Sequence, residues 1–150
     1  MAVALPYVDE HVVDIPAPRE DVWAAVVGQW STDGRDRPRL EVARILGCRP
    51  LHPSAGDLRL GSTLPGFRVS RFDAPAVLGL EGEHRFSRYA LVITLESAGT
   101  GTRVAAETRA AFPGLAGRAY RALVIDSGLH VMAMRRLLGS LRRAALARAG

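Results

Sequence analysis

A chain of 150 residues, 48% of them hydrophobic, suits one domain that buries roughly 70% of the surface its unfolded form exposes. Charged residues, glycine or proline interrupt the apolar residues every few positions, so no stretch approaches the roughly 20 apolar residues of a membrane-spanning helix. The net charge of +5 rests on 20 arginines and no lysine, scattered along the chain, and this scatter argues against a nucleic-acid surface.

The single cysteine, Cys48, excludes an internal disulfide and lacks the second thiol or histidine pair that a zinc site requires. We expect a small buried residue at this position and a reducing, cytoplasmic setting for the protein. The opening stretch 1–6 carries no basic residue before its apolar residues, so it does not have the pattern of a secretory signal. Neither a metal nor another cofactor is expected.

The first two expected elements are a strand and a short helix. Residues 7–15 alternate in polarity and run into two nearby prolines, which is typical of a strand that ends there. Residues 19–27 carry two acids in their first turn and apolar side chains at helical spacing. Gly28 is expected to end this helix.

The middle of the chain predicts mostly strands. Residues 29–39 are polar and predict a loop or a short irregular helix, residues 40–46 return to a strand pattern, and residues 47–61 predict a long loop. Further extended segments are expected at 63–72, 76–84, 85–96 and 102–111. The segment 85–96 alternates most clearly, with one apolar face made by Tyr89, Leu91, Ile93 and Leu95.

From Leu115 onward the pattern predicts one helix of more than 25 residues. Two glycines, Gly128 and Gly139, weaken this helix by roughly 1 kcal/mol each relative to alanine. Its apolar stripe, at spacings of three and four, consists of Leu123, Ser127, His130, Met134, Leu137, Leu141 and Ala145, with Ala119, Tyr120 and Val124 beside its first turns.

This order of elements predicts an α+β fold in which a curved antiparallel sheet of about six strands wraps round a long C-terminal helix. One helix cannot fill the groove of a curved sheet with side chains of ordinary size, so we expect an internal cavity for a small ligand. Neither a repeat nor a linker divides the chain, and residues 1–150 are therefore expected to form a single domain.

Part of the chain resembles a known superfamily. Residues 15–23, IPAPREDVW, are similar to the pattern I-x-A-P-x-E-x-V-W of START-like (SRPBCC) proteins, which include birch-pollen allergens, lipid-transfer START domains and polyketide cyclases. The segments LPGFRV at 64–69 and GRAYR at 117–121 are similar to small bacterial members of unknown function. The resemblance implies a helix-grip fold that binds a small hydrophobic ligand such as a lipid, an isoprenoid or a polyketide-like aromatic. It implies no particular reaction, because the superfamily shares a pocket and no universal catalytic residues.

His130 follows Asp126 by four residues, which places the two side chains on one face of the expected helix. A carboxylate that orients an imidazole suits a general base, and it equally describes a structural ion pair. With one strand carboxylate, these residues would carry an alternative function, that of an enzyme resembling polyketide cyclases or dehydratases. Whether the protein is an enzyme stays open at this point.

Charged strand residues and amphipathic aromatics complete the candidate site. Glu107 and Arg109 share one face of a strand, and Glu81 and Glu83 share one face of another. Such pairs anchor a ligand if they point inward and are ordinary solvated charges if they point outward. The expected ligand-binding residues are Trp23, Tyr89, Leu91, Ile93, Glu107, Arg109, Tyr120, Leu123, Ser127 and Met134.

The last helix also carries the densest group of positive charges, namely Arg135, Arg136, Arg142 and Arg143. A helix C-terminus favours positive charge, so these side chains fit a solvated helical face. They also permit a second alternative function, an interaction module for RNA or an acidic protein.

Overall fold

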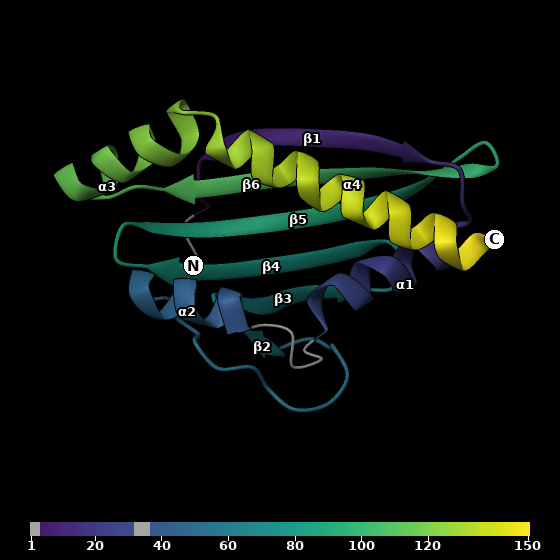
Figure 1. Cartoon of the computed structure of the whole chain (residues 1–150), viewed down its shortest axis with the longest axis horizontal. Helices are drawn as coiled ribbons and strands as arrows, with labels where there is room; N and C mark the ends of the chain where they lie inside the picture. The colour runs from purple at the N-terminus through teal and green to yellow at the C-terminus, as the bar shows by residue number, and fades with distance from the viewer. Residues whose placement is uncertain (1–3, 32–36) are drawn as a thin grey trace.

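Alternation of inward and outward side chains along six strands builds one antiparallel sheet. The computed structural model describes residues 4–31 and 37–150, and its strands follow the order β1-β6-β5-β4-β3-β2 (Figure 1). The strands are β1 (Tyr7–Ile15), β2 (Thr63–Leu64), β3 (Phe67–Asp73), β4 (Val77–His84), β5 (Ser87–Ala98) and β6 (Gly101–Ala111). The predicted α+β fold with a curved antiparallel sheet is confirmed.

The helices lie on one side of this sheet (Figure 1). They are α1 (Arg19–Trp30), α2 (Arg37–Leu46), α3 (Gly114–Arg121), a π-helical turn η1 (Ala122–Asp126) and the long α4 (Leu129–Ala149). None of these described helices combines the length and the apolar character that crossing a membrane requires.

The densest packing lies where α1 and the C-terminal part of α4 meet the sheet. From α4, the buried residues are Met134, Leu138, Leu141 and Ala145, and α1 adds Val22, Ala25, Val26 and Trp30. The sheet adds Ile15, Leu78, Leu80, Ile93, Leu95 and Val104, each at most 1% exposed. No described residue of α4 before Met134 belongs to this core, so the core fills only one end of the groove.

Residues 40–46, predicted as a strand, belong to α2, and this prediction was wrong. Val42 and Ile45 are β-branched and suggested a strand, but the residues that face the interior, Arg39, Ala43 and Leu46, recur at helical spacing. The ion pair between Glu41 and Arg44, at 3.2 Å, is an i,i+3 contact of a helix.

Two other predicted boundaries also change. The first helix continues through Gly28 to Trp30, because a solvated glycine weakens a helix without ending it. The segment 63–72 is divided by a turn at Pro65 and Gly66, where φ of the glycine is 85°. The predicted loop 29–39 lies partly outside the described residues, as does the opening stretch 1–6.

The predicted helix of more than 25 residues is instead α3, η1 and α4 in succession. The break falls at Gly128, whose φ of 84° lies in the left-handed region that other residues avoid. The Ser127 hydroxyl donates a hydrogen bond to the Leu123 carbonyl and accepts one from the Leu129 amide at 3.4 Å. The break turns the first part of the predicted stripe outward, and Leu123 is 65% exposed.

The break at Gly128 is tested by alanine. Because Gly128→Ala forces a Cβ into the left-handed region, we expect the free energy of unfolding to fall by about 1 kcal/mol. Gly28→Ala is the matched control: its Cβ meets nothing within 4 Å, and alanine in a helix should raise the free energy of unfolding by about 0.5–1 kcal/mol. Urea denaturation measures both, and equal effects of the two substitutions would contradict a break at Gly128.

Candidate ligand-binding cavity

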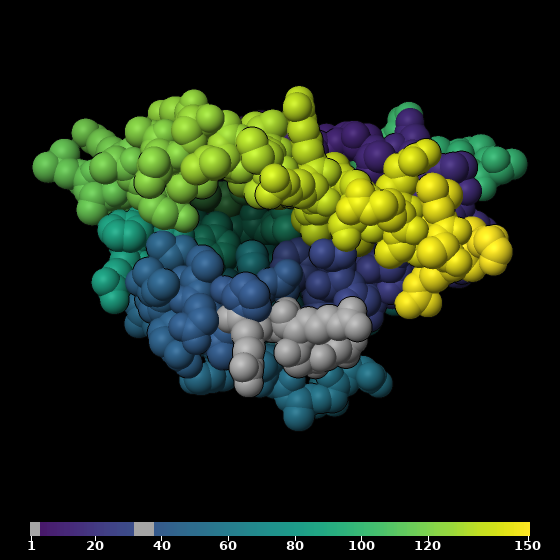
Figure 2. Space-filling view, viewed as in Figure 1, coloured from purple at the N-terminus to yellow at the C-terminus, as the bar shows by residue number. Residues whose placement is uncertain are grey.

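The end of the groove that the core leaves open contains a cavity of about 610 Å³. Its walls are α2, the inner faces of β5 and β6, the turn before β3, and the chain from Tyr120 to Leu137. Figure 2 shows the mouth as a hollow between α2 and the α3–α4 segment, with the strands visible at its bottom. Most side chains that line the cavity are apolar or aromatic.

Helix α2 supplies one wall because its inward residues recur every three to four positions. Val42, Ala43 and Leu46 line the cavity from successive turns. Arg39 lines it as well, with its guanidinium carbon 5.1 Å from the centre of the Trp30 ring, at cation–π distance. The wall therefore combines aliphatic side chains with one cation held over an aromatic face.

Tyr89 closes the cavity beside the turn before β3. Its hydroxyl donates a 2.5 Å hydrogen bond to the Gly66 carbonyl, and its ring meets the Phe67 ring edge-on at 5.4 Å. A Cβ at Gly82 would lie 2.1 Å from that same carbonyl oxygen, so only glycine lets the turn lie against β4. Burial raises the pKa of the Tyr89 phenol, which keeps it a neutral donor.

Cys48 is buried at the same wall, as predicted for a small interior residue. Burial raises the pKa of its thiol above the ordinary value, so the thiol stays protonated and a poor nucleophile. Cys48 therefore contributes shape and apolar surface to the cavity.

An aromatic cluster closes the end of the cavity between β4 and α3. The His84 ring lies 4.7 Å from the Tyr120 ring, which stacks on Phe86 at 5.3 Å. Nδ1 of His84 accepts a hydrogen bond from the Phe86 amide at 3.1 Å, so the neutral ring carries its proton on Nε2, 3.3 Å from the Ser87 hydroxyl. Burial lowers the pKa of His84 and raises that of Tyr120, so both groups are neutral near pH 7.

Two residues that line the cavity carry buried polar atoms with no partner among the described residues: Oγ1 of Thr108 and Nε1 of Trp30. A buried polar atom left unpaired costs about 1–3 kcal/mol. A ligand with a matching polar group would recover part of that cost. The third such atom, Nε of Arg19, belongs to a residue away from the cavity.

The structure gathers five of the predicted site residues at the cavity, namely Tyr89, Leu91, Tyr120, His130 and Met134. Trp23 and Ile93 pack in or against the core instead. Leu123, Asp126 and Ser127 are exposed, and η1 lines the cavity with Val124 and Ile125 instead.

The predicted charged pairs lie on the outer face of the sheet. Thr108 is buried against the helices, so its strand neighbours Glu107 and Arg109 point away from them and form an ion pair with each other. Glu83 pairs with Arg49 and Arg88, at 3.3 and 3.2 Å. These side chains are surface charges, so they are not anchors for a ligand in the cavity.

The carboxylate beside His130 is Asp9 of β1, not Asp126. Nε2 of His130 lies 3.1 Å from Oδ1 of Asp9, and Nε2 of His11 lies 3.0 Å from Oδ2 of the same residue. The predicted pairing with Asp126 was wrong, because it required an unbroken helix through Gly128. Strand alternation carried a signal for Asp9, since it shares a face with His11 and, further on, Ile15.

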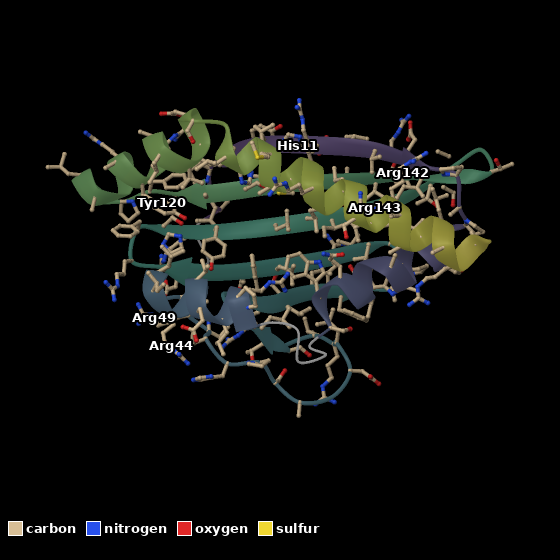
Figure 3. All side chains as sticks on the ribbon, viewed as in Figure 1. His11, Arg44, Arg49, Tyr120, Arg142 and Arg143 are labelled. Carbon is tan, nitrogen blue, oxygen red and sulfur yellow. The ribbon has the colours of Figure 1, made fainter. Side chains whose placement is uncertain are left out.

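Other predicted features stay separate from the cavity. The arginines of α4 are exposed, and Figure 3 shows Arg142 and Arg143 on its outer side. No group of three or more His, Cys, Asp or Glu side chains within residues 4–31 and 37–150 is arranged to hold a metal ion.

Comparison with known proteins places the fold. No protein-family model matches the chain, and no curated protein does. Among solved structures, CalU16 from Micromonospora echinospora is 18% identical, with a TM-score of 0.55 over 97% of this chain and 91% of that one. Norcoclaurine synthase from Thalictrum flavum is 13% identical, with a TM-score of 0.57 over 97% and 98% of the two chains. Ara h 8.0201 is 12% identical, with a TM-score of 0.57 over 93% and 95%.

These neighbours share the START-like fold, and each alignment covers more than 90% of both chains. The chain therefore has the helix-grip fold of these neighbours, which is the fold that the resemblance of its opening segment implied. Identities of 12–18% establish the fold alone, so the chemistry of the cavity has to be argued from its own residues.

The lowered pKa of His84 predicts a loss of stability in acid. Because the unfolded chain takes up the proton first, the stability contributed by the neutral ring is present above about pH 6.5 and is lost as the pH falls from there toward the folded-state pKa. His84→Asn keeps an acceptor for the Phe86 amide but does not titrate. Between about pH 7.5 and about pH 5.5, urea denaturation should show a smaller loss of stability for His84→Asn than for the wild type.

His52→Asn, in an exposed loop, is the control and should follow the wild type. If His84→Asn also follows the wild type, the His84 ring is not desolvated in the folded protein.

Proposed function

We propose that this protein binds a small, largely apolar molecule in the cavity between the sheet and helices α2, α3 and α4. The observation that carries the proposal is the cavity itself, about 610 Å³ and lined mainly by apolar side chains. Small-molecule sites typically enclose about 300–1,000 Å³, so this volume suits an organic ligand of several rings or a short chain. A cytoplasmic setting stays a prediction from the lone cysteine.

The lining favours an aromatic, polyketide-like ligand over a flexible lipid or isoprenoid. Aromatic rings reach the cavity from several directions, including Trp30, Phe67, Tyr89, Phe112 and Tyr120. Rings of this kind pack edge-on or offset against a planar guest. The unpartnered atoms of Thr108 and Trp30 would match one or two oxygens on such a guest.

The second candidate function is an enzyme that acts on this ligand. The contact between His130 and Asp9 at the cavity wall favours it, because an imidazole held by a carboxylate is a common proton-transfer group. The names of the neighbours leave both functions open, since norcoclaurine synthase is an enzyme by its name and Ara h 8.0201 carries no reaction in its name.

Filling the cavity tests the binding proposal. Ala133 lines the cavity from α4, and Ala133→Trp places an indole there. Fluorescence titration with N-phenyl-1-naphthylamine, an uncharged aromatic probe, should show binding to the wild type and at least about tenfold weaker binding to Ala133→Trp, a change of about 1.4 kcal/mol.

Ala147→Trp is the matched control, because Ala147 is exposed on the same helix and outside the cavity. It should bind the probe as the wild type does, and urea denaturation should confirm that both variants are folded. Equal binding by all three proteins, or none by the wild type, would refute the cavity as the binding site.

A further inference from the structure

Three polar residues meet at the edge of the cavity where β1, β6 and α4 come together. Asp9 pairs with Thr108 in the β1–β6 register, so their side chains share the inner face of the sheet. His130 reaches Asp9 from the first turn of α4, and both His130 and Thr108 line the cavity. Figure 3 places His11 on β1 beside this part of α4.

The contacts of Asp9 select one tautomer of His130. A carboxylate only accepts hydrogen bonds, so Nε2 of His130 carries the proton that it donates to Oδ1 of Asp9. In the neutral ring, Nδ1 then carries a lone pair, and it has no hydrogen-bond partner among the described residues. His11 binds the other carboxylate oxygen, which holds Asp9 in place from a second side.

Burial separates this group from ordinary surface charges. The side chains of His130, His11 and Asp9 are 16%, 19% and 24% exposed, whereas those of Asp14 and Arg103, an ion pair further along β1 and β6, are 66% and 55% exposed. Thr108 is 8% exposed, and its hydroxyl is unpartnered although Asp9 lies opposite it. Two residues that line the cavity thus carry an atom without a hydrogen-bond partner among the described residues, Nδ1 of His130 and the buried hydroxyl of Thr108.

We propose that Asp9 and His130 form a proton-transfer pair for a ligand that carries a carbonyl group next to a C–H bond, and that the Thr108 hydroxyl donates a hydrogen bond to the carbonyl oxygen. This inference rests on the proposed function, because the ligand must occupy the cavity. His130 and Thr108 touch the ligand, whereas Asp9 is a positioning residue that acts through His130.

The step balances within the site and the ligand. Nδ1 of His130 removes the proton from the carbon next to the carbonyl, and the C–H electron pair forms a C=C bond. The carbonyl π pair moves to the oxygen, and the resulting enolate accepts the hydrogen bond from Thr108. Asp9 balances the charge of the imidazolium, which returns a proton to the same or another carbon of the enolate. Nothing is oxidised or reduced.

The experiment follows exchange of the α-protons of 2-tetralone in D₂O by proton NMR, since each removal and return replaces a proton by a deuteron. The wild type should accelerate exchange above the rate in buffer alone. Asp9→Asn should lose at least about 100-fold of this acceleration, because the amide donates to Nε2 and moves the proton of His130 to Nδ1. His130→Gln should abolish the acceleration.

Matched controls carry the same chemical changes elsewhere. Asp14→Asn on the exposed part of β1 and His52→Gln in a loop should exchange 2-tetralone as the wild type does. Thr108→Val should also lose exchange, yet it should raise the midpoint of urea unfolding because it removes an unpaired buried hydroxyl. If the role of Thr108 were purely structural, Thr108→Val would not lose exchange while its midpoint of unfolding rises.

Long-range ¹H–¹⁵N NMR of the histidine rings supplies a second readout that needs no turnover. His130 should be the Nε2–H tautomer in the wild type and the Nδ1–H tautomer in Asp9→Asn. If N-phenyl-1-naphthylamine binds but 2-tetralone neither binds nor exchanges, or if Asp9→Asn exchanges normally, the proton-transfer inference fails and the binding function stands. If neither compound binds, the proposed function itself fails.

Discussion

The packing of α4 against the sheet at one end only is the constraint on which the rest of the structure depends. From Met134 onward the helix contributes its buried side chains to the core that it shares with α1 and the sheet, and this packing is dense enough to fix its position. Before Met134 the same helix faces the cavity, and the break at Gly128 lets α3 and η1 take a separate course. The packing from Met134 onward therefore fixes the position of α4, and the cavity lies beside the first turns of the same helix.

Most polar atoms of the residues that line the cavity already form hydrogen bonds within the protein. The Tyr89 hydroxyl is bound to the Gly66 carbonyl, and Nδ1 of His84 is bound to the Phe86 amide. A ligand cannot use those atoms without breaking an existing hydrogen bond. The groups left for recognition are few, which suits a guest that is apolar over most of its surface and polar at one or two points.

The sequence was sufficient to predict the architecture of the sheet. It was less successful for the helices that shape the cavity. Strand alternation is a local signal, and it identified the inner face of β5 because Leu91, Ile93 and Leu95 all pack on the same side. Helix α2 was not predicted because Val42 and Ile45 carry strand propensity. The helical spacing of its inward residues becomes visible only when the structure shows which of its side chains line the cavity. Gly128 was read as a weak helix position, since nothing in a helical pattern distinguishes a tolerated glycine from one with positive φ.

The candidate site also shows that local sequence patterns cannot identify contacts between segments far apart in the chain. His130 was found from the stripe of α4, but its predicted partner was sought within the helix, where spacing rules apply, and the actual partner comes from β1, more than 100 residues earlier in the chain. Asp9 lies on the inner face of β1, where apolar neighbours would make a carboxylate costly unless it is paired. Two histidines supply that pairing, so the placement of Asp9, His11 and His130 is mutually dependent. Because START-like neighbours at 12–18% identity show only the fold, such a contact is a property of this chain's own residues, and it gives the cavity a chemistry that the fold by itself does not imply.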